Sequence, residues 1–600
     1  MRYSQLSISH ICRFLNEARL SFKNVLLMHG FILFVFFPLL SSYTRIILKH
    51  SKIPYLSYDL LPSIITDHPF ALFFLTLLLI VVVLAAFFEF TFLLLTVFFI
   101  KKKQPITVLQ LIHGTLLQIK KIRPLTFLFF LFYFFLILPI SYINFHSDVL
   151  AKIKIPAFIL DFIFANRVIL ISIYILYYLV ITYLGIRLIF ALPQLILVRS
   201  ISFCQSLKIS WKKTRHQTWR LVIQMLAIWL FIILLLLIAS LLIFLGQWFV
   251  EQFFSSYAFI SAVIAMTLLQ CLFLLNIVLS SLSILYIIIE NMSVNQLLPD
   301  LPEWFSVKKK KKFSYTRKGK SLLLIMTFLF SIGVVIYNAN YLRSASKIYP
   351  LAISHRGVNG TNGVQNTLPA LISTSKAKPN YVEMDIYETK DKQFVVMHDF
   401  DLDQLAGIKK RVNQLTLKEL QALTVKENGK TASICSFDDY LKTAKNLNQK
   451  LIIEIKTTKQ DTSDVIDLFI KKYRTIILKE HHFIHTLTYE TAIQLKQKEP
   501  RFYVGYIVPF NVVGPPIGPV DFFSMEYSTL NRNFINAAHE DGKKVFAWTV
   551  NDKAGMKRLM FYGVDGIMTD ELTILKKTMQ TDLKHPTYSD KLFNFVIGIN

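Results

Sequence analysis

Polar residues collect at the ends of short apolar runs in the last 250 residues of the 600-residue chain. Seven of them carry charge or can carry a proton: His355, Arg356, Glu383, Asp385, His398, Glu454 and Lys456. Polar side chains at the ends of parallel strands form the catalytic face of a (β/α)8 barrel. Two imidazoles, three carboxylates and two permanent cations suit the metal-assisted cleavage of a phosphate ester.

The three carboxylates form a candidate metal site. Glu383 and Asp385 point to the same side of one expected strand, because side chains alternate with a period of two. Glu454 joins them from another strand and completes a set of three hard oxygen ligands. Such ligands favour Mg²⁺ or Ca²⁺ over zinc. The alternative is that the three acids only form salt bridges with Arg356 and Lys456.

The remaining four positions suit phosphate binding and proton transfer. Arg356 offers a planar fork to two phosphate oxygens, and Lys456 adds a point charge. We expect His355 and His398 to divide the proton work, one as base and one as acid, but the sequence does not assign either role. A single buried histidine is more often a packing residue; two at strand ends, beside Arg or Asp, favour catalysis.

Alternating strand-like and helical segments indicate how these residues are positioned. Apolar runs occur at 351–354, 381–387, 393–398, 450–455, 481–487, 502–508, 521–527, 543–549 and 565–568. Helical stretches are expected at 414–424, 436–447, 462–478, 488–498, 531–541 and 552–560. This alternation predicts an α/β fold with a parallel sheet. Because the second and third runs are too close for a parallel crossover, a tight turn joins them and eight barrel strands remain.

The first half of the chain has the composition of a membrane domain. The chain is 54% hydrophobic, with a mean hydropathy of +0.48. A spanning helix needs about 20 apolar residues. Seven spans are predicted, at 24–45, 69–100, 124–146, 168–198, 221–246, 257–289 and 321–341. The sequence thus predicts a multi-span α-helical membrane domain at 1–341, a linker at 342–349, a TIM barrel at 350–580 and a tail at 581–600.

The charge distribution predicts an orientation. Residues 1–350 carry 33 Lys and Arg against 10 Asp and Glu, so most of the net charge of +28 lies in the membrane half. The loops 101–123, 199–220 and 290–320 carry six, six and eight basic residues, and the alternate loops carry three or fewer. Basic loops stay inside. We therefore expect a multi-pass cell-membrane protein with a cytoplasmic N-terminus and an extracellular barrel; no basic stripe predicts nucleic-acid binding.

Two ionisable residues lie deep in predicted spans, Glu89 and Arg187. Charged groups at that depth face protein or water. They mark either a polar path for lipid or substrate, or a buried pair that fixes helix packing.

Seven ordered motifs carry a resemblance to a known family. They are His355-Arg356-Gly357, Gln365-Asn366-Thr367, Glu383 with Asp385, His398-Asp399, Glu454 with Lys456, Trp548 to Asn551, and Gly563 to Asp570. The sequence closely resembles the glycerophosphodiester phosphodiesterases, and more narrowly their bacterial membrane-bound branch with a multi-span N-terminal domain. The resemblance covers about 350–575 by motif, and the N-terminal half by architecture only.

The resemblance implies hydrolysis of glycerophosphodiesters to glycerol 3-phosphate and an alcohol, with Glu383, Asp385 and Glu454 as ligands of one divalent cation. The family route is attack by the neighbouring glycerol hydroxyl, which gives a cyclic phosphate that water then opens. The family's tryptophan matches Trp548, which would line the glycerol end of the pocket. Glu526 faces the site or its rim, and Asn366 either positions substrate or braces His355.

Substrates implied by the resemblance are phospholipid-derived headgroups, glycerol-phosphate polymers of the envelope, or lysophospholipids. Two alternatives stay open: cleavage of lysophospholipid or sphingolipid headgroups on the same barrel, and a non-catalytic membrane sensor or transporter that binds phosphodiesters. One departure from the family is Gln365, where many relatives have Glu. Another is the end of the run 481–487, His485-Thr486-Leu487, where soluble relatives often show Ser-Phe.

Overall fold

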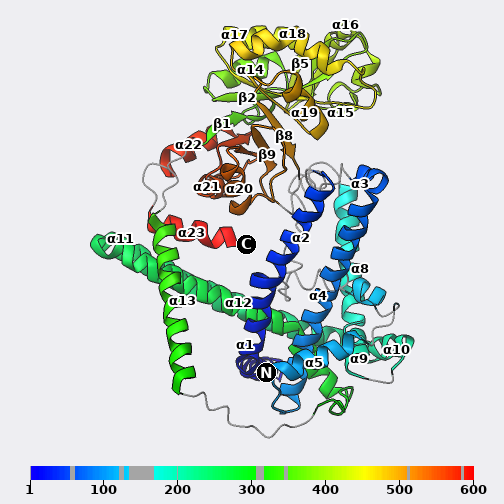
Figure 1. The fold of residues 1–600 in the computed structure, drawn as a ribbon, viewed down its shortest axis with the longest axis vertical. Coiled ribbons are helices and arrows are strands. Elements are labelled where there is room, and N and C mark those ends of the chain that lie inside the picture. The colour runs from blue at the N-terminus through cyan, green and yellow to red at the C-terminus, as the bar shows by residue number, and fades with distance from the viewer. Residues whose placement is uncertain are drawn as a thin grey trace. The chain divides into compact units, whose positions relative to one another are not determined.

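The structure is a computed structural model. It describes residues 2–53, 61–120, 124, 127–133, 168–198, 201–305, 317–343, 349–509, 514–582 and 587–599. The chain divides into two compact units, one that comprises Met1–Ser51, Pro62–Ile155 and Ile159–Leu342, and one that contains Arg343–Asn600. Figure 1 shows long helices in the first unit and a strand-and-helix domain in the second.

All regular secondary structure among the described residues of the first unit is helical. Its helices are α1 (Arg2–Phe31), α2 (Phe37–His50), α3 (Leu61–Asp67), α4 (Pro69–Lys101), α5 (Val108–Ile119), α8 (Val168–Arg187), α9 (Ala191–Leu197), α10 (Phe203–Thr214), α11 (Thr218–Phe253), α12 (Ala258–Val294) and α13 (Arg317–Arg343). A π-helical turn, Ile32–Phe36, joins α1 to α2, and the 3-10 turn Ser255–Tyr257 separates α11 from α12. Apolar side chains from α1, α4, α11 and α12 form one buried core.

Six helical stretches among the described residues are long and apolar enough to cross a bilayer. They are Ser9–His50, Pro69–Lys101, Ile175–Leu197, Thr218–Phe253, Ser255–Val294 and Leu324–Arg343. Each overlaps one of the seven predicted spans. The remaining prediction, 124–146, lies outside the described residues apart from 124 and 127–133.

The two deep ionisable residues have partners of their own. Glu89 is buried and lies 3.8 Å from Nδ1 of His29, whose Nε2 is 2.9 Å from the hydroxyl of Ser281. Arg187 is also buried, and its guanidinium lies 4.3 Å from the ring centre of Trp211 and donates to that residue's carbonyl. Both contacts join different helices, which is consistent with the packing interpretation.

The second unit is a closed parallel barrel. Its strands are β1 (Leu351–Ser354), β2 (Tyr381–Glu388), β6 (Leu451–Ile455), β7 (Phe483–Thr486), β8 (Val504–Val508), β9 (Phe522–Glu526), β10 (Lys544–Trp548) and β11 (Gly566–Thr569). Neighbours in this order pair in parallel, and β1 pairs with both β11 and β2, which closes the ring. Strand β3 (Phe394–Val396) runs antiparallel to β2. The predicted eight-stranded barrel, with a tight turn between its second and third runs, is confirmed.

Helices cover the barrel between most strands: α14 (Leu368–Ser375), α17 (Phe437–Asn446), α18 (Val465–Lys479), α19 (Tyr489–Lys498), α20 (Arg532–Glu540), α21 (Lys553–Tyr562) and α22 (Leu572–Asp582). The segment expected to be a tail holds a further helix, α23 (Tyr588–Ile599), in which Leu592 is fully buried.

One predicted helix is wrong in extent. The expected 414–424 is the short helix α16 (Leu417–Gln421), and the chain then forms a hairpin of β4 (Thr424–Glu427) and β5 (Lys430–Ser433). Between these strands stand Asn428 and Gly429, at φ 52° and 69°. Asn-Gly at positive φ is the preferred two-residue hairpin turn. The residues on either side of it therefore pair as strands, and the predicted helix does not continue. A short helix, α15 (Asp403–Ala406), precedes this region.

Period-two alternation along the strands decides what faces the barrel interior. On β2, Val382, Met384 and Ile386 pack against the surrounding helices in the main core. Tyr381 belongs instead to the inner cluster with Phe483, Phe522 and Phe546, which fills the barrel. On β2 the side chains two and four positions after Tyr381, Glu383 and Asp385, therefore also point inward, nearer the carboxyl end of the strand. That rule positions the polar site.

Candidate active site

The turn after β1 is built around two charged residues. His355 and Arg356 lie in the 3-10 turn His355–Gly357, where Arg356 adopts φ +50°. That left-handed conformation is uncommon for a residue other than glycine and needs support from its surroundings. The backbone N–H of Arg356 donates to Glu383 over 2.8 Å, and its carbonyl accepts from the N–H of Asn366 over 2.8 Å. The turn is therefore fixed to β2.

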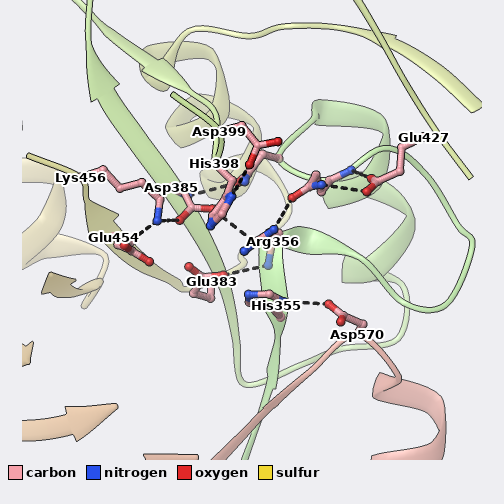
Figure 2. Close-up of polar contacts among 12 residues, drawn as sticks. His355, Arg356, Glu383, Asp385, His398, Asp399, Glu427, Glu454, Lys456 and Asp570 are labelled. Carbon is pink, nitrogen blue, oxygen red and sulfur yellow. Dashed lines mark hydrogen bonds and ion pairs between the residues drawn. The ribbon is translucent and has the colours of Figure 1, made fainter. Parts of the chain in front are cut away.

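His355 is paired with an aspartate from the last strand. Its Nδ1 lies 2.8 Å from Asp570, which follows β11 and accepts from the side chain of Asn551 over 2.8 Å. Burial lowers the pKa of His355 and so does the charge of Arg356, but the ion pair with Asp570 outweighs them and leaves that pKa above 6.5. Burial opposes the charged form of Asp570 as well, yet His355 lowers the pKa of that carboxyl to about 2. Figure 2 shows this pair beside Arg356.

The second histidine has a corresponding partner. Nδ1 of His398 is 2.7 Å from the carboxylate of Asp399, and both side chains are about one third exposed. Burial and the charges of Lys456 and Arg356 lower the pKa of His398 below 6.5. The two environments thus act in opposite directions: the protonated form of His355 and the neutral form of His398 are favoured.

Lys456 joins two of the three carboxylates. Asp385 and Glu454 are direct neighbours in the parallel pairing of β2 and β6. The ammonium of Lys456 lies 3.1 Å from Asp385 and 2.7 Å from Glu454 (Figure 2). Burial raises the pKa of Glu454, whereas the neighbouring cations, led by Lys456, overcome burial and lower that of Asp385.

Two side chains of the loop after β1 hold the acids and the arginine. The amide of Asn366 donates to Asp385 over 2.7 Å and accepts from its N–H over 3.1 Å, so Asn366 braces Asp385. Gln365 accepts from the guanidinium of Arg356 over 2.7 Å and donates to Glu427 over 2.8 Å. The amide at position 365 therefore links Arg356 to the β4–β5 hairpin.

The remaining predicted pocket residues lie on β9 and β10. Glu526 and Trp548 are paired in register, and both belong to the inner face. The carboxylate of Glu526 accepts from the backbone of Ser528 and Thr529 over 3.0 Å, which fixes the turn after β9. The indole N–H of Trp548 donates to the carbonyl of Ser524 over 2.9 Å.

A divalent cation fits the chemistry of the acidic group. Oxygen atoms of Glu383 and Glu454 and a ring nitrogen of His485 all lie within 4.8 Å of one another. Glu383 and Glu454 are at most 9% exposed, and Asp385 is 1% exposed. Buried carboxylates this close repel one another unless cations offset their charge. Lys456 and Arg356 supply two positive charges against three carboxylates. One negative charge is therefore left for a bound cation to offset.

Five residues with clear contacts in the site were not assigned a role from the sequence: Asp399, Glu427, His485, Asn551 and Asp570. Three of them stand inside the quoted motifs, so their positions carried a signal. His485 carried a weaker one, namely its inward phase on β7. No sequence signal marked Glu427, because its contact with Gln365 depends on the β4–β5 hairpin, which was not predicted.

The fold and the site define a membrane-spanning protein with a (β/α)8 barrel suited to phosphate-ester chemistry. Comparison with known families agrees. Residues 8–331 match the membrane domain of glycerophosphoryl diester phosphodiesterase, and residues 355–574 match the glycerophosphoryl diester phosphodiesterase family. The chain belongs to the glycerophosphodiester phosphodiesterase family, in its branch with a membrane domain.

Individual relatives resemble the barrel half. A glycerophosphodiester phosphodiesterase from Caldanaerobacter subterraneus subsp. tengcongensis is 26% identical over 229 residues, which cover 37% of this chain and 94% of that protein. One from Bacillus subtilis is 22% identical and covers 42% and 96%. The crystal structure of a glycerophosphodiester phosphodiesterase from Parabacteroides distasonis is 24% identical, with a TM-score of 0.35, and covers 40% and 100%.

Family membership makes this protein a phosphoric diester hydrolase of the glycerophosphodiester phosphodiesterase class. The matching membrane domain and the six apolar helices make it a multi-pass membrane protein.

Proposed function

We propose that this protein hydrolyses glycerophosphodiesters to glycerol 3-phosphate and an alcohol at the outer face of the membrane, with a divalent cation and two catalytic histidines. The observation that carries the proposal is the arrangement at the carboxyl ends of the strands. Two separate His–Asp pairs lie beside a group of three carboxylates and two cations, as Figure 2 shows. A non-catalytic binding barrel has no need for two such pairs.

The carboxylates of Glu383, Asp385 and Glu454 would hold the cation, Mg²⁺ or Ca²⁺ by the hardness of their oxygens. When bound, such an ion polarises a phosphoryl oxygen and offsets the charge that develops on it. Asn366 contributes by fixing the orientation of Asp385, with which it exchanges two hydrogen bonds.

Arg356 and Lys456 would bind the phosphate. The guanidinium of Arg356 is aligned from one side by Gln365, and its Nε lies 3.8 Å from Asp385. Burial disfavours the charge on Lys456, but Asp385 and Glu454 outweigh it and raise the pKa of the ammonium. Lys456 therefore stays a permanent cation in the site, so both groups can neutralise phosphate charge throughout a reaction.

The two histidines divide the proton transfers. His398 is partly exposed and its neutral form is favoured, so it accepts the proton of the attacking hydroxyl at Nε2, since its Nδ1 faces Asp399. His355, whose protonated form the Asp570 carboxylate favours, donates from Nε2 to the leaving oxygen. Environments that push two pKa values apart are the usual basis of such a division. By the resemblance, the attacking hydroxyl belongs to the glycerol and the first product is a cyclic phosphate.

Trp548 would line the glycerol end of the pocket. It is inward on β10, half-buried, and tied by its indole to the backbone of β9. Glu526, next to it in register, is bound to the turn after β9. We assign Glu526 the role of shaping the pocket rim.

Purified full-length protein in detergent tests the activity. Glycerophosphocholine, glycerophosphoglycerol and a lysophospholipid would be offered separately, with Mg²⁺ or Ca²⁺ and with EDTA. We expect release of glycerol 3-phosphate from at least one glycerophosphodiester, and loss of that release in EDTA. Preferred release of a headgroup from the lysophospholipid would favour the alternative substrate class, and turnover unaffected by EDTA would remove the metal from the proposal.

Histidine variants test the catalytic roles. His355→Ala and His398→Ala should each reduce turnover of glycerophosphodiesters by about 10²–10⁴-fold. A matched control is His539→Ala, because His539 also pairs with an aspartate, Asp565, over 2.7 Å but near the amino end of β11. A p-nitrophenyl diester, whose leaving group needs no protonation, should restore turnover to the His355 variant and not to the His398 variant. Restoration of the opposite variant would exchange the two roles.

A further inference from the structure

His485 lies in the acidic group, although it belongs to none of the residues assigned above. It stands on β7, with its side chain 2% exposed. In the parallel pairing of β6 and β7 it is the direct neighbour of Glu454. Like Glu454, it is two positions after a side chain of the inner cluster, Phe483, so it points into the barrel toward the site.

Within the described part of the chain, one ring nitrogen of His485 has a hydrogen-bond partner and the other has none. Nδ1 is 2.9 Å from the hydroxyl of Ser524, which is fully buried on β9. Nε2 is buried and has no hydrogen-bond partner among the residues that the structure describes. Its nearest ion-pair neighbour is an oxygen of Glu383 at 3.7 Å, too far for a hydrogen bond.

This arrangement is unfavourable without a cation. When the Ser524 hydroxyl accepts from Nδ1–H, the lone pair of the imidazole is on Nε2, and it faces the lone pairs of Glu383 and Glu454. A buried nitrogen without a hydrogen-bond partner carries a free-energy cost. A positive ion among the three ligand atoms removes this cost, because each of them can donate an electron pair to it. A hydrogen bond from the second ring nitrogen is also the usual way in which a metal-bound histidine is oriented.

We propose that His485 is a nitrogen ligand of the divalent ion, together with Glu383 and Glu454, and that it shifts the preference of the site from Ca²⁺ and Mg²⁺ toward a first-row transition ion such as Mn²⁺ or Zn²⁺. Ca²⁺ and Mg²⁺ take oxygen ligands, whereas imidazole suits transition ions. The inference rests on the metal site of the proposed function and revises the ion expected from the carboxylates alone.

Electron paramagnetic resonance of Mn²⁺ tests the ligand directly. Full-length protein in detergent would be stripped with EDTA and loaded with Mn²⁺ at less than one equivalent. Spin-echo modulation then reports any ¹⁴N nucleus bound to the ion. We expect ¹⁴N modulation in the wild-type protein and its loss in His485→Gln. Its absence from the wild-type protein would overturn the proposal even if the variant failed to fold.

His482→Gln is a matched control, because His482 is buried three positions earlier and its Nδ1 accepts from the backbone of Leu451 over 3.1 Å. It should keep the ¹⁴N signal; loss of that signal in His482→Gln but not in His485→Gln would contradict the assignment. Titration with Mn²⁺ against Ca²⁺ gives the second readout. Loss of a residue that merely hydrogen-bonds a metal ligand lowers metal affinity by about 10–100-fold. Loss of the ligand itself in His485→Gln should therefore weaken Mn²⁺ binding by about tenfold or more, and Ca²⁺ binding less. Equal weakening of both ions would refute the selectivity.

These outcomes separate the inference from the proposed function. Hydrolysis of glycerophosphocholine by the metal-loaded wild-type protein, without ¹⁴N modulation, would leave the phosphodiesterase proposal standing and reject His485 as a ligand. Nitrogen modulation without hydrolysis of any offered diester would support the ligand and reject the substrate class.

Discussion

A buried histidine at the amino ends of the barrel strands should make the barrel sensitive to acid. His482 is 3% exposed, and its Nδ1 accepts from the N–H of Leu451, the first residue of β6. Its Nε2 is buried with no hydrogen-bond partner among the described residues. Burial, with smaller contributions from Lys450 and His481, lowers the pKa of His482 from 6.5 to about 4.

The sign and size of the effect follow from proton linkage. Between pH 6.5 and 4 the unfolded chain protonates His482 and the folded barrel does not, so stability falls as the pH falls through this window. At pH 5 the loss relative to pH 7.5 is about 2 kcal/mol, and it approaches about 3 kcal/mol below pH 4. Above pH 7 the contribution is complete. For a domain of this size, about 2 kcal/mol corresponds to a fall in Tm of about 4–8 °C.

The assay follows the barrel alone through one thiol. Cys435 is 4% exposed, and burial raises the pKa of its thiol to about 12, so in the folded barrel it is unreactive. Full-length protein in detergent would be equilibrated in urea at pH 7.5 and at pH 5, then given a brief labelling pulse. Peptide mass spectrometry of the Cys435 segment gives the free energy of unfolding at each pH. We expect His482→Gln, whose amide can accept from Leu451 but cannot take a proton, to lose about 2 kcal/mol less than the wild-type protein.

The exposed His481 provides the control. His481→Gln should keep most of the acid sensitivity, since its charge is a minor cause of the shift. Parallel pH dependence in the wild-type protein and His482→Gln would refute the reasoning, because it would show that His482 is protonated in the folded barrel as readily as in the unfolded chain.

Three further predictions concern the active site and its orientation. The rate of hydrolysis should have a bell-shaped pH profile. Asp570→Asn should move the alkaline limb of that profile to lower pH, because it removes the charge that raises the pKa of His355, whereas Asp399→Asn should leave the limb in place. An unmoved alkaline limb in Asp570→Asn would contradict the pairing of His355 with Asp570. Glu427→Ala should lower kcat/KM by about tenfold, because it removes a charge-assisted hydrogen bond to Gln365, whose amide aligns Arg356. Lys430→Ala on the same hairpin should leave kcat/KM unchanged. Equal activity of the two variants would show that Glu427 does not align Arg356 through Gln365. In the outward orientation, Lys430→Cys should react with a membrane-impermeant maleimide on intact cells beyond the wild-type background, and protection until lysis would place the barrel inside.

The barrel could be predicted from the sequence because the two signals that indicate it lie within short stretches of the chain. Short apolar runs and helical stretches alternate, and a link of a few residues cannot make a parallel crossover, so Tyr381–Glu388 and Phe394–Val396 had to form a hairpin. The phase of each strand then placed Glu383 and Asp385 inward. The β4–β5 hairpin was missed because the residues before it favoured a helix, although Asn428-Gly429 is a strong turn signal.

Contacts between loops that follow different strands could not be predicted from the sequence. Asp570 and His355 are 215 residues apart, and their pairing depends on closure of the barrel between β11 and β1. Gln365 shows the same limit. From the sequence, Gln365 was noted only as a departure from the Glu of many relatives; in the fold its amide connects Arg356 with Glu427, a contact that depends on where the hairpin lies.

Charge balance explains why a neutral nitrogen is a suitable addition to this site. Asp385 and Glu454 form ion pairs with Arg356 or Lys456, and Glu383 accepts from the backbone N–H of Arg356. Three carboxylates and two cations leave one net negative charge in a buried group. A divalent cation would change that charge to one positive, and a phosphodiester, which carries a single negative charge, would bring it to zero. A fourth carboxylate in place of His485 would leave the substrate complex one charge too negative, whereas an imidazole adds a ligand atom without adding charge. The same count disfavours the product, because a phosphate monoester with its second pKa near 6 carries close to two negative charges at pH 7. The site thus matches the charge of the diester more closely than that of the monoester it releases.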